Sequence, residues 1–326
     1  MTILIHNTNH TAALNRRLPS ILPRKVGKAV MNKRTWKREL NYSLFIVPAL
    51  LFYVLFTVYP FLSMFYYSVT DYTVRKISDL SFVGLDNYKH LFSSNLLRTG
   101  LKNSILYALL MTVFQTALGL VLAVFLDRKF ATRNLLRSVF FMPAVFSPLI
   151  VGFLWGYLMS TSDYGLINQG LTALGLSKIN FLGDKDIALY SIVFTQLWQW
   201  TGWAMVIFLA NLQSIPKDLY EAADIDGASR WKQFWRVTLP LMQPSVNVVT
   251  VTAMIGGLKV FDIILALTDG GPGNATQTIM TAYIKTSFNE GFYNRGAAFG
   301  VVFFGIVMVI TLVMMRYLSK WGEKIR

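Results

Sequence analysis

The sequence predicts an all-α integral membrane protein, and three observations carry this prediction. Of the 326 residues, 54% are hydrophobic and only 14% are charged, a balance unlike that of a water-soluble domain. Six apolar runs reach the length of about 20 residues that a helix needs to cross a bilayer. Between the fourth and fifth runs lies an amphipathic segment, residues 213–244, whose charges must keep it outside the lipid.

Residues 1–41 form a basic arm that precedes the first apolar run. The arm contains nine Lys or Arg and a single acidic residue, Glu39. It lacks an apolar stretch followed by a small-residue cleavage site, so we expect it to be retained. Two interpretations are open: a cytoplasmic tail that touches anionic lipid, and a dedicated site for a partner.

Residues 42–326 are expected to form one transmembrane domain with six transmembrane helices. The first span carries Pro48 and Pro60, which predict a tilted or bent helix. In chain order, the expected spans are residues 42–69, 103–126, 138–160, 187–212, 245–267 and 297–318.

The distribution of Lys and Arg predicts the orientation of these spans, because short cytoplasmic segments carry the excess of basic residues. The N-terminal arm, residues 127–137, residues 213–244 and the C-terminal tail hold nine, four, four and four of them, 21 in all. The three intervening loops hold five, two and two. Both termini and the segment 213–244 are therefore expected on the cytoplasmic side.

The segment 213–244 is predicted to form two short helices. Its acidic residues come first and its basic residues last, the order that a helix dipole favours, and Gly227 interrupts the middle. Trp231, Phe234 and Trp235 recur at helical spacing and are expected to anchor the second helix against the ends of the spans. These features fit both an amphipathic loop in the headgroup region and a docking element for another chain.

The residues of this segment resemble the EAA loop of the permease subunits of ABC-type importers. The resemblance rests on Glu221-Ala222-Ala223, Asp226-Gly227-Ala228, Phe234, Leu239-Pro240 and Pro244. It extends to the order of the spans and to two further phrases, residues 82–88 (FVGLDNY) and 267–273 (LTDGGPG), which are similar to the carbohydrate branch, the maltose and glycerol-phosphate type permeases. It covers roughly residues 40–326.

This resemblance implies a subunit of an ATP-driven, binding-protein-dependent importer in the bacterial plasma (inner) membrane. The implied partners are an ABC ATPase dimer, a second homologous permease chain and an extracytoplasmic solute-binding protein. The EAA loop would be a two-piece coupling helix seated on the ATPase, contacted through Glu221, Ala222, Ala223, Asp226, Gly227 and Ala228. No Walker A pattern occurs in the chain, so Mg-ATP would be held by the partner ATPase and no cofactor by this chain.

The resemblance also implies that the fourth and fifth spans line the path of a sugar, moved by alternating access. In the fourth span, Gln196, Gln199, Trp200 and Trp203 combine amides with aromatic faces, which suits the hydroxyl rim and the apolar face of a sugar. An interfacial aromatic belt is the other interpretation of these side chains.

In the fifth span, the expected path residues are Ala253, Gly257, Lys259 and Asp262. Gly256 and Gly257 are also consistent with close helix packing. Lys259 and Asp262 are three residues apart, which would place them on one face of a continuous helix. They are expected either to pair with each other or to face a water-filled path, where an unpaired Lys259 would favour an acidic sugar.

Several other functions are disfavoured by the sequence. The chain has no cysteine, and its three histidines match no metal-ligand spacing, so we expect neither an enzyme nor a metal site. The net charge of +15 is spread between hydrophobic runs, which does not suit nucleic-acid binding. A self-contained ion-coupled carrier or channel stays open as the alternative, with Lys259 and Asp262 as the charges that it would use.

Overall fold

The computed structural model describes residues 45–325, so the basic arm of residues 1–41 lies outside the described residues. The chain divides into two compact units, Met1–Tyr59 and Pro60–Arg326. In the first unit, the described residues form a helix that begins at Phe45 and includes the π-helical turn η1 (Val54–Val58). The second unit is built from helices, and bridges of β type occur in its described part only at Thr70–Phe82 and Thr73–Lys76.

Within residues 45–325, four uninterrupted helices are long and apolar enough to cross a membrane. They are Phe45–Ser68, which includes α2 (Tyr59–Ser68), then α4 (Asn95–Asp127), α8 (Ala188–Ser214) and the segment Tyr293–Leu318 of α15 (Tyr293–Ile325). Each coincides with one of the expected spans. Helix α4 begins eight residues earlier than expected, where the Ser94 hydroxyl accepts a hydrogen bond from the amide of Leu96 and caps the helix.

The third expected span is not one continuous helix. It consists of α5 (Arg133–Phe141), the 3₁₀ turn η2 (Met142–Val145) and α6 (Pro148–Leu158), with a bend of 102° between the two parts. Pro143 and Pro148 cannot donate main-chain hydrogen bonds to a preceding turn, and Ser147 caps the new helix by accepting from the amide of Leu149. The third expected span is therefore present as a bent pair of helices and not as one straight helix.

The fifth expected span is also broken. Helix α12 (Gln243–Leu258) ends before Lys259, and α13 (Asp262–Leu267) begins three residues later. The Thr278 hydroxyl donates to the carbonyl of Val260 at 3.1 Å and so satisfies a main-chain group that the break leaves free. Before α12, the stretch Arg230–Leu241 meets it at 67°. Counting each bent pair as one span gives up to six crossings among the described residues.

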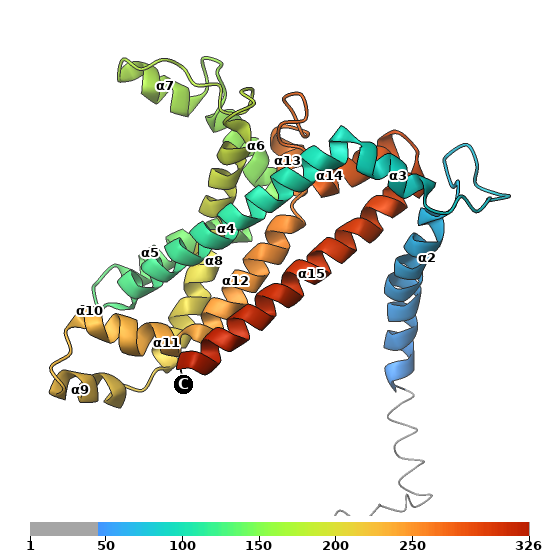
Figure 1. Cartoon of the computed structure of the whole chain (residues 1–326). Helices are drawn as coiled ribbons and strands as arrows, with labels where there is room; N and C mark the ends of the chain where they lie inside the picture. The colour runs from blue at the N-terminus through green and yellow to red at the C-terminus, as the bar shows by residue number, and fades with distance from the viewer. Residues whose placement is uncertain (1–44, 326) are drawn as a thin grey trace, which may run out of the picture. The chain divides into compact units, whose positions relative to one another are not determined.

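The remaining helices lie at the two ends of the second unit (Figure 1). At one end are α3 (Asp86–Ser93), α7 (Leu166–Ala173), α13 and α14 (Ile279–Ile284), which is followed by the π-helical η4 (Lys285–Asn289). At the other end are α9 (Asp218–Ile225), α10 (Arg230–Gln233) and α11 (Leu239–Leu241), with the π-helical η3 (Phe234–Thr238) between the last two. Residues 274–296 were expected to be a loop, but they contain α14 and η4. Thr278 and Thr281 form a capping box that stabilises the start of α14.

The motif of residues 82–88 connects two helices by hydrogen bonds at the end of the second unit where α3 lies. The Asn87 amide donates to the carbonyls of Ser68 and Thr70, both at 2.8 Å, and its oxygen accepts from the amide of Asn294 at 2.9 Å. Tyr88 adds a hydrogen bond of 2.8 Å to the Ser68 hydroxyl. These buried bonds join the end of α2 to the start of α15, segments more than 200 residues apart in sequence.

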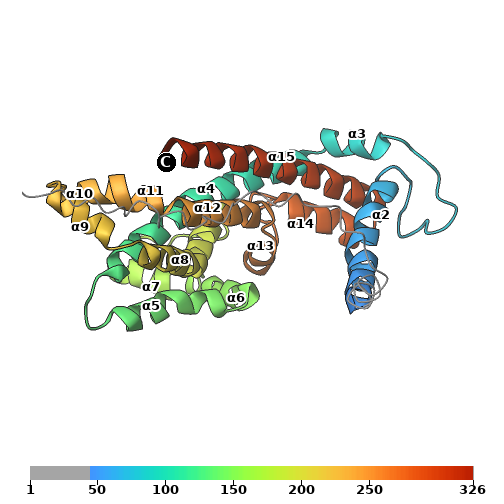
Figure 2. The same cartoon turned by 90° about the horizontal axis from the view of Figure 1, so that it is seen from below.

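Helices α4, α8 and α12 pack along one another and form the centre of the second unit (Figures 1 and 2). Gly257 of α12 lies so close to α4 that a Cβ at this position would stand 2.7 Å from the Cα of Ala108. Gly202 of α8 lies even closer to α5, since a Cβ there would stand 1.9 Å from the carbonyl oxygen of Phe140. Absence of a side chain is what allows these helices to approach.

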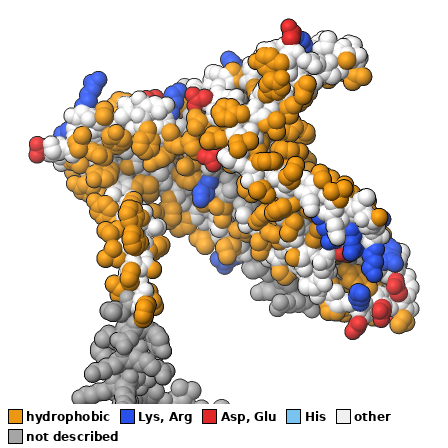
Figure 3. Space-filling model, turned by 180° about the vertical axis from the view of Figure 1, so that it is seen from behind, with side chains coloured by type: hydrophobic (Ala, Val, Ile, Leu, Met, Phe, Trp, Pro, Cys, Tyr) orange, Lys and Arg blue, Asp and Glu red, His pale blue; other side chains and the backbone are white. Residues whose placement is uncertain are grey.

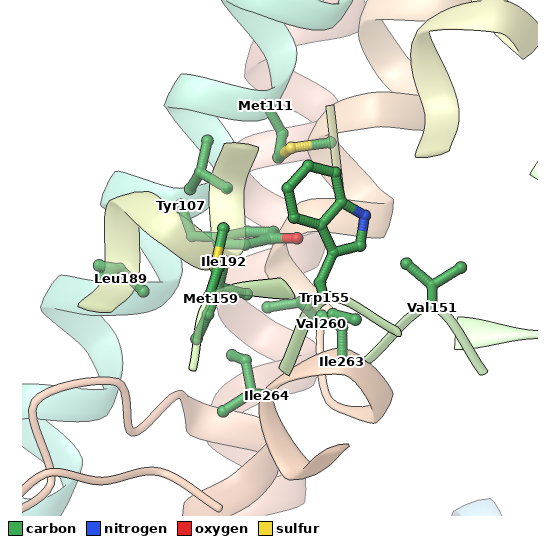
Figure 4. Close-up of a cluster of buried hydrophobic side chains, with 11 residues drawn as sticks. Tyr107, Met111, Val151, Trp155, Met159, Leu189, Ile192, Val260, Ile263 and Ile264 are labelled. Carbon is green, nitrogen blue, oxygen red and sulfur yellow. The ribbon is translucent and has the colours of Figure 1, made fainter. Parts of the chain in front are cut away.

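Two of the apolar clusters in the described residues contain residues of both α4 and α8. The first cluster contains Tyr107, Met111, Val151, Trp155, Met159, Leu189, Ile192, Val193, Val260, Ile263 and Ile264 (Figure 4). The second cluster contains Ala123, Leu126, Ala204, Met205, Phe208, Leu209, Leu212, Ile215, Met242 and Val249. Each cluster draws residues from the α4 and α8 helices and from α12 or the residues adjoining it, so the same group of helices is sealed at two levels.

Candidate functional site: a central cavity and a two-helix loop

A cavity of about 360 Å³ lies between α4, α8, α12 and the break that follows α12. Its lining combines indole rings with amide, hydroxyl and charged groups: Tyr107, Met111, Gln115, Pro148, Gln196, Trp200, Trp203, Thr252, Ala253, Gly256, Gly257, Lys259, Val260, Phe261, Asp262 and Ile263. Apolar walls with a few polar groups are typical of small-molecule sites, and the volume falls within their usual range of about 300–1,000 Å³.

The first cluster forms part of the cavity wall, since Tyr107, Met111, Val260 and Ile263 belong to both, and the second cluster follows the cavity along α4 and α8. On α8, the lining residues 196–203 follow the first-cluster residues 189–193 and precede the second-cluster residues 204–212. On α4, lining residues 107–115 likewise precede second-cluster residues 123–126. The cavity is therefore bounded by apolar packing on both sides along the axes of α4 and α8.

Seven of the eight residues predicted for the substrate path line this cavity. Gln199 is the exception, because it is fully buried behind the wall and its amide donates to the carbonyl of Phe146 at 2.9 Å. The Gln199 oxygen accepts from Gln196 at 2.8 Å, and the Gln196 oxygen accepts from the Trp200 indole at 3.1 Å. This chain of hydrogen bonds fixes the orientation of the Trp200 ring at the cavity wall.

Lys259 and Asp262 both line the cavity, but they do not share a helical face. Lys259 caps the C-terminal end of α12 and Asp262 begins α13, so the break separates them. No ion pair joins them within 4.0 Å in the part of the chain that the structure describes, and both side chains are exposed. The positive Lys259 lies at the C-terminal end of α12 and the negative Asp262 at the N-terminal end of α13, the ends at which the helix dipole stabilises each charge. The described residues thus show no ion pair between Lys259 and Asp262, and both residues line the cavity; that this cavity is the solute path stays a prediction.

Sequence reasoning missed the contribution of α4 to the cavity. Tyr107, Met111 and Gln115 are four residues apart from one another and so lie on one face of this helix. Gln115 also donates to the carbonyl of Trp200 at 3.3 Å. Two polar side chains at this spacing within an apolar span are the signal that would have identified this wall.

The predicted division of the segment 213–244 into two helices at Gly227 is confirmed. Gly227 has φ +70°, and its amide donates to the carbonyl of Asp224 at 3.0 Å, while the amide of Ala228 donates to the carbonyl of Ala223 at 2.9 Å. These two bonds form a Schellman motif that ends α9, with Gly227 in the left-handed position that favours glycine. The turn then leads directly into α10, which Ser229 caps.

A buried side chain holds the two helices of this loop together. Gln233 of α10 is only 3% exposed, and its amide donates to the carboxylate of Asp224 and to the carbonyl of Ala228. Glu221, Ala222 and Asp226 remain exposed on the α9 side. The loop thus has a braced interior and a free outer face, where Figure 3 shows charged side chains of both signs gathered at one extremity of the molecule.

The aromatic residues of α10 and η3 do not anchor the loop as expected. Trp231 is 70% exposed and Trp235 is 50% exposed, and their rings contact each other and Phe234. Ile225 at the end of α9 is 88% exposed. Large apolar side chains therefore stand on the free face of the loop, which is unusual for a surface that meets only water.

Comparison with known proteins agrees with this architecture. Residues 115–321, more than half of the chain, match the family described as binding-protein-dependent transport system inner membrane component. The chain is 33% identical over 290 residues to the probable ABC transporter permease protein YurN of Bacillus subtilis, covering 86% of this chain and 97% of that protein. It is 35% identical over 278 residues to the trehalose/maltose transport system permease protein MalF of Thermococcus litoralis, covering 85% and 93%.

A solved structure shows the same fold. It is a chain of a bacterial ABC transporter involved in the import of the acidic polysaccharide alginate, with a TM-score of 0.79 at 23% identity. The match covers 88% of this chain and 99% of that chain.

Membrane-spanning helices around a cavity large enough for a small solute fit the class of transport proteins. This chain is a member of the family of binding-protein-dependent transport system inner membrane components, the permease subunits of ABC transporters. Membership decides against the alternative of a self-contained carrier or channel, because the transport systems of this family depend on a binding protein.

Proposed function

We propose that this chain forms half of the translocation path of an ATP-driven importer for a sugar or oligosaccharide. The observation that carries the proposal is the central cavity, in which Trp200 and Trp203 offer aromatic faces beside the polar groups of Gln196, Lys259 and Asp262. Sugars bind where hydrogen-bonding groups surround an aromatic surface. Relatives named for trehalose/maltose, for starch degradation products and for arabinooligosaccharides support this solute class.

The proposed assembly contains an ABC ATPase dimer that binds Mg-ATP, a second homologous permease chain and an extracytoplasmic solute-binding protein. A solved neighbour of 23% identity and TM-score 0.77 is described in complex with an alginate pentasaccharide-bound periplasmic protein. In alternating access, rearrangement of the two permease chains relative to each other would open the cavity to one side of the membrane at a time.

The exposed face of the loop 213–244 is the proposed seat of the ATPase. Glu221 and Asp226 would provide charged contacts, Ile225 and Trp231 would be buried by the partner, and Ala222, Ala223 and Ala228 would permit close approach. The C-terminal helix supports a common side for this loop and the C-terminus, since Gln243 of α12 donates to the carbonyl of Leu318 in α15. Together with the excess of basic residues, this favours the cytoplasmic side for both.

Reconstitution tests the proposal. The permease pair, the ATPase and the binding protein are assembled in liposomes, and uptake of labelled oligosaccharides is measured with ATP inside or outside the membrane barrier. We expect uptake only when ATP is available to the ATPase and the solute is presented by the binding protein. Uptake driven by an ion gradient without ATP would refute the proposal.

The docking role of the loop has a matched test. Glu221→Gln removes a charge from the proposed ATPase seat, and Glu290→Gln removes an exposed charge from the opposite end of the second unit. We expect the first variant to co-purify with less ATPase and the second to behave as the wild type. Equal recovery of the ATPase with both variants would remove Glu221 from the proposed contact.

A further inference from the structure

The outer face of the two-helix loop is exposed, and on its inner side one side chain of α9 packs against the membrane helices. None of the eight residues of α9 is fully buried, and Leu219, Glu221 and Ile225 are all exposed. Tyr220 is half-buried and is the α9 side chain that packs against the second apolar cluster. Its hydroxyl lies 3.0 Å from the hydroxyl oxygen of Thr238, a hydrogen-bonding distance.

The partner of this hydrogen bond is itself fixed in place. Thr238 is 6% exposed and ends the π-helical η3, one residue before α11. The carbonyl of Thr238 accepts the amide of Met242 at 2.9 Å, and Met242 is a fully buried member of the second cluster. Tyr220 is therefore hydrogen-bonded to a buried residue of the segment that leads into α12.

The cluster reached by Tyr220 contains residues of each of the helices that wall the cavity. Leu126 belongs to α4, Phe208 and Leu212 to α8, and Val249 to α12. Well-packed interiors transmit displacement because they have few voids and low compressibility. The Schellman motif at Gly227 and the hydrogen bonds of Gln233 hold α9 and α10 together as one rigid unit. A displacement of the outer face of α9 would therefore move the whole unit against the second cluster.

We propose that Tyr220 is the positioning residue that carries movement of the ATPase-contacting loop into the helices around the cavity. This inference rests on the proposed function of the loop. The ring transmits the displacement to the second cluster, and the hydroxyl bond to Thr238 holds the ring at a fixed angle to α12. Glu221, the next residue in sequence, is exposed on the proposed ATPase-binding face. Adjacent residues of α9 would thus contact the ATPase on one side and the membrane helices on the other.

The test measures solute transported per ATP hydrolysed by the reconstituted complex. Tyr220→Phe removes the hydroxyl and keeps the ring, Thr238→Val removes the partner hydroxyl at nearly constant volume, and Tyr220→Ala removes both ring and hydroxyl. We expect Tyr220→Ala to lower the ratio by about fivefold or more, the lower limit of typical coupling between sites, and the two hydroxyl variants to lower it less. The double variant Tyr220→Phe with Thr238→Val should be no worse than either single variant, because both remove the same bond.

Two controls separate this role from docking and from folding. The ATPase should co-purify with the Tyr220 variants in wild-type amounts, and binding protein loaded with solute should still stimulate ATP hydrolysis. Tyr190→Phe, at a tyrosine of α8 that is 51% exposed, should leave the solute transported per ATP hydrolysed unchanged.

Two outcomes would overturn the inference: an unchanged ratio of solute to ATP in Tyr220→Ala, or loss of the ATPase from that variant. Failure of the wild-type complex to bind an ATPase would instead refute the proposed function.

Discussion

The side-chain amide of Gln199 donates to the main-chain carbonyl of Phe146, 53 residues earlier in the chain. Phe146 stands at the break between η2 and α6, where the bent third span leaves main-chain groups without partners in its own helix. A buried glutamine of α8 thus stabilises the bend and, through Gln196, orients the Trp200 ring in the cavity.

Replacing Gln199 by Leu should therefore destabilise the protein. The change leaves the Phe146 carbonyl and the Gln196 amide without their partner in a buried position, which costs about 1–3 kcal/mol. Thermal unfolding of the detergent-solubilised complex measures this loss. Gln213→Leu, at an exposed residue near the end of the same helix, is the control and should unfold near the wild-type temperature.

Gly227 is predicted to be needed for its backbone conformation alone. A Cβ at this position would meet nothing within 4 Å, so Gly227→Ala should cost only the penalty of about 1–2 kcal/mol for a left-handed residue. Gly227→Asn should be milder, because asparagine tolerates this conformation. Gly227→Pro also removes the amide that donates to Asp224, and we expect it to remain in the membrane while uptake is lost.

A second glycine provides the matched control for this series. Gly175 has φ +77°, ends α7 with the same pair of hydrogen bonds, and likewise has open space where a Cβ would stand, with nothing within 4 Å. Gly175→Ala should carry a similar conformational cost but leave the uptake per hydrolysed ATP unchanged. If both alanine variants change this ratio equally, Gly227 has no special role in coupling.

The adjacent glycines of α12 should respond in opposite ways. Gly257→Ala forces a Cβ to 2.7 Å from Ala108, so α12 and α4 must separate, at a cost of about 1–3 kcal/mol. Gly256→Ala meets nothing within 4 Å and gains helix propensity, so it should be neutral or stabilising. Unfolding temperatures of the two purified variants give the comparison, and equal losses would contradict the packing described for Gly257.

Lys259 should favour acidic solutes and Asp262 should disfavour them. Both line the cavity as separate charges, so Lys259→Gln removes attraction and Asp262→Asn removes repulsion. We expect uptake of an acidic oligosaccharide, relative to a neutral one, to fall about tenfold in the first variant, the loss of one charged hydrogen bond. The ratio should rise in the second variant. A change in the same direction for both would indicate a structural defect.

Much of the fold could be predicted because its signals are local. Apolar runs define the four continuous spans, and the order of charges with Gly227 defines the two helices of the loop. The breaks in the third and fifth spans depend on partners distant in sequence, such as Gln199 for Phe146 and Thr278 for Val260. Such bonds leave no trace in a hydropathy pattern, although Pro143 and Pro148 are a local signal of the break in the third span.

The candidate site was predicted in its residues more fully than in its geometry. Seven of the eight residues expected on the solute path line the cavity, whereas the face of α4 was not foreseen. That this cavity is the solute path stays a prediction. The relation of Lys259 to Asp262 was misjudged because a spacing of three places side chains together only if the helix is continuous. A polar break within a span therefore changes which residues can meet.

The two apolar clusters on either side of the cavity bear on the permeability of the membrane to ions. A hydrated ion in the cavity would have to shed its water to move along the helix axes into either cluster, in which Ile192 and Phe208 are both fully buried. Moving a bare charge into such surroundings is costly. The interior of this chain would therefore resist the entry of ions at both levels.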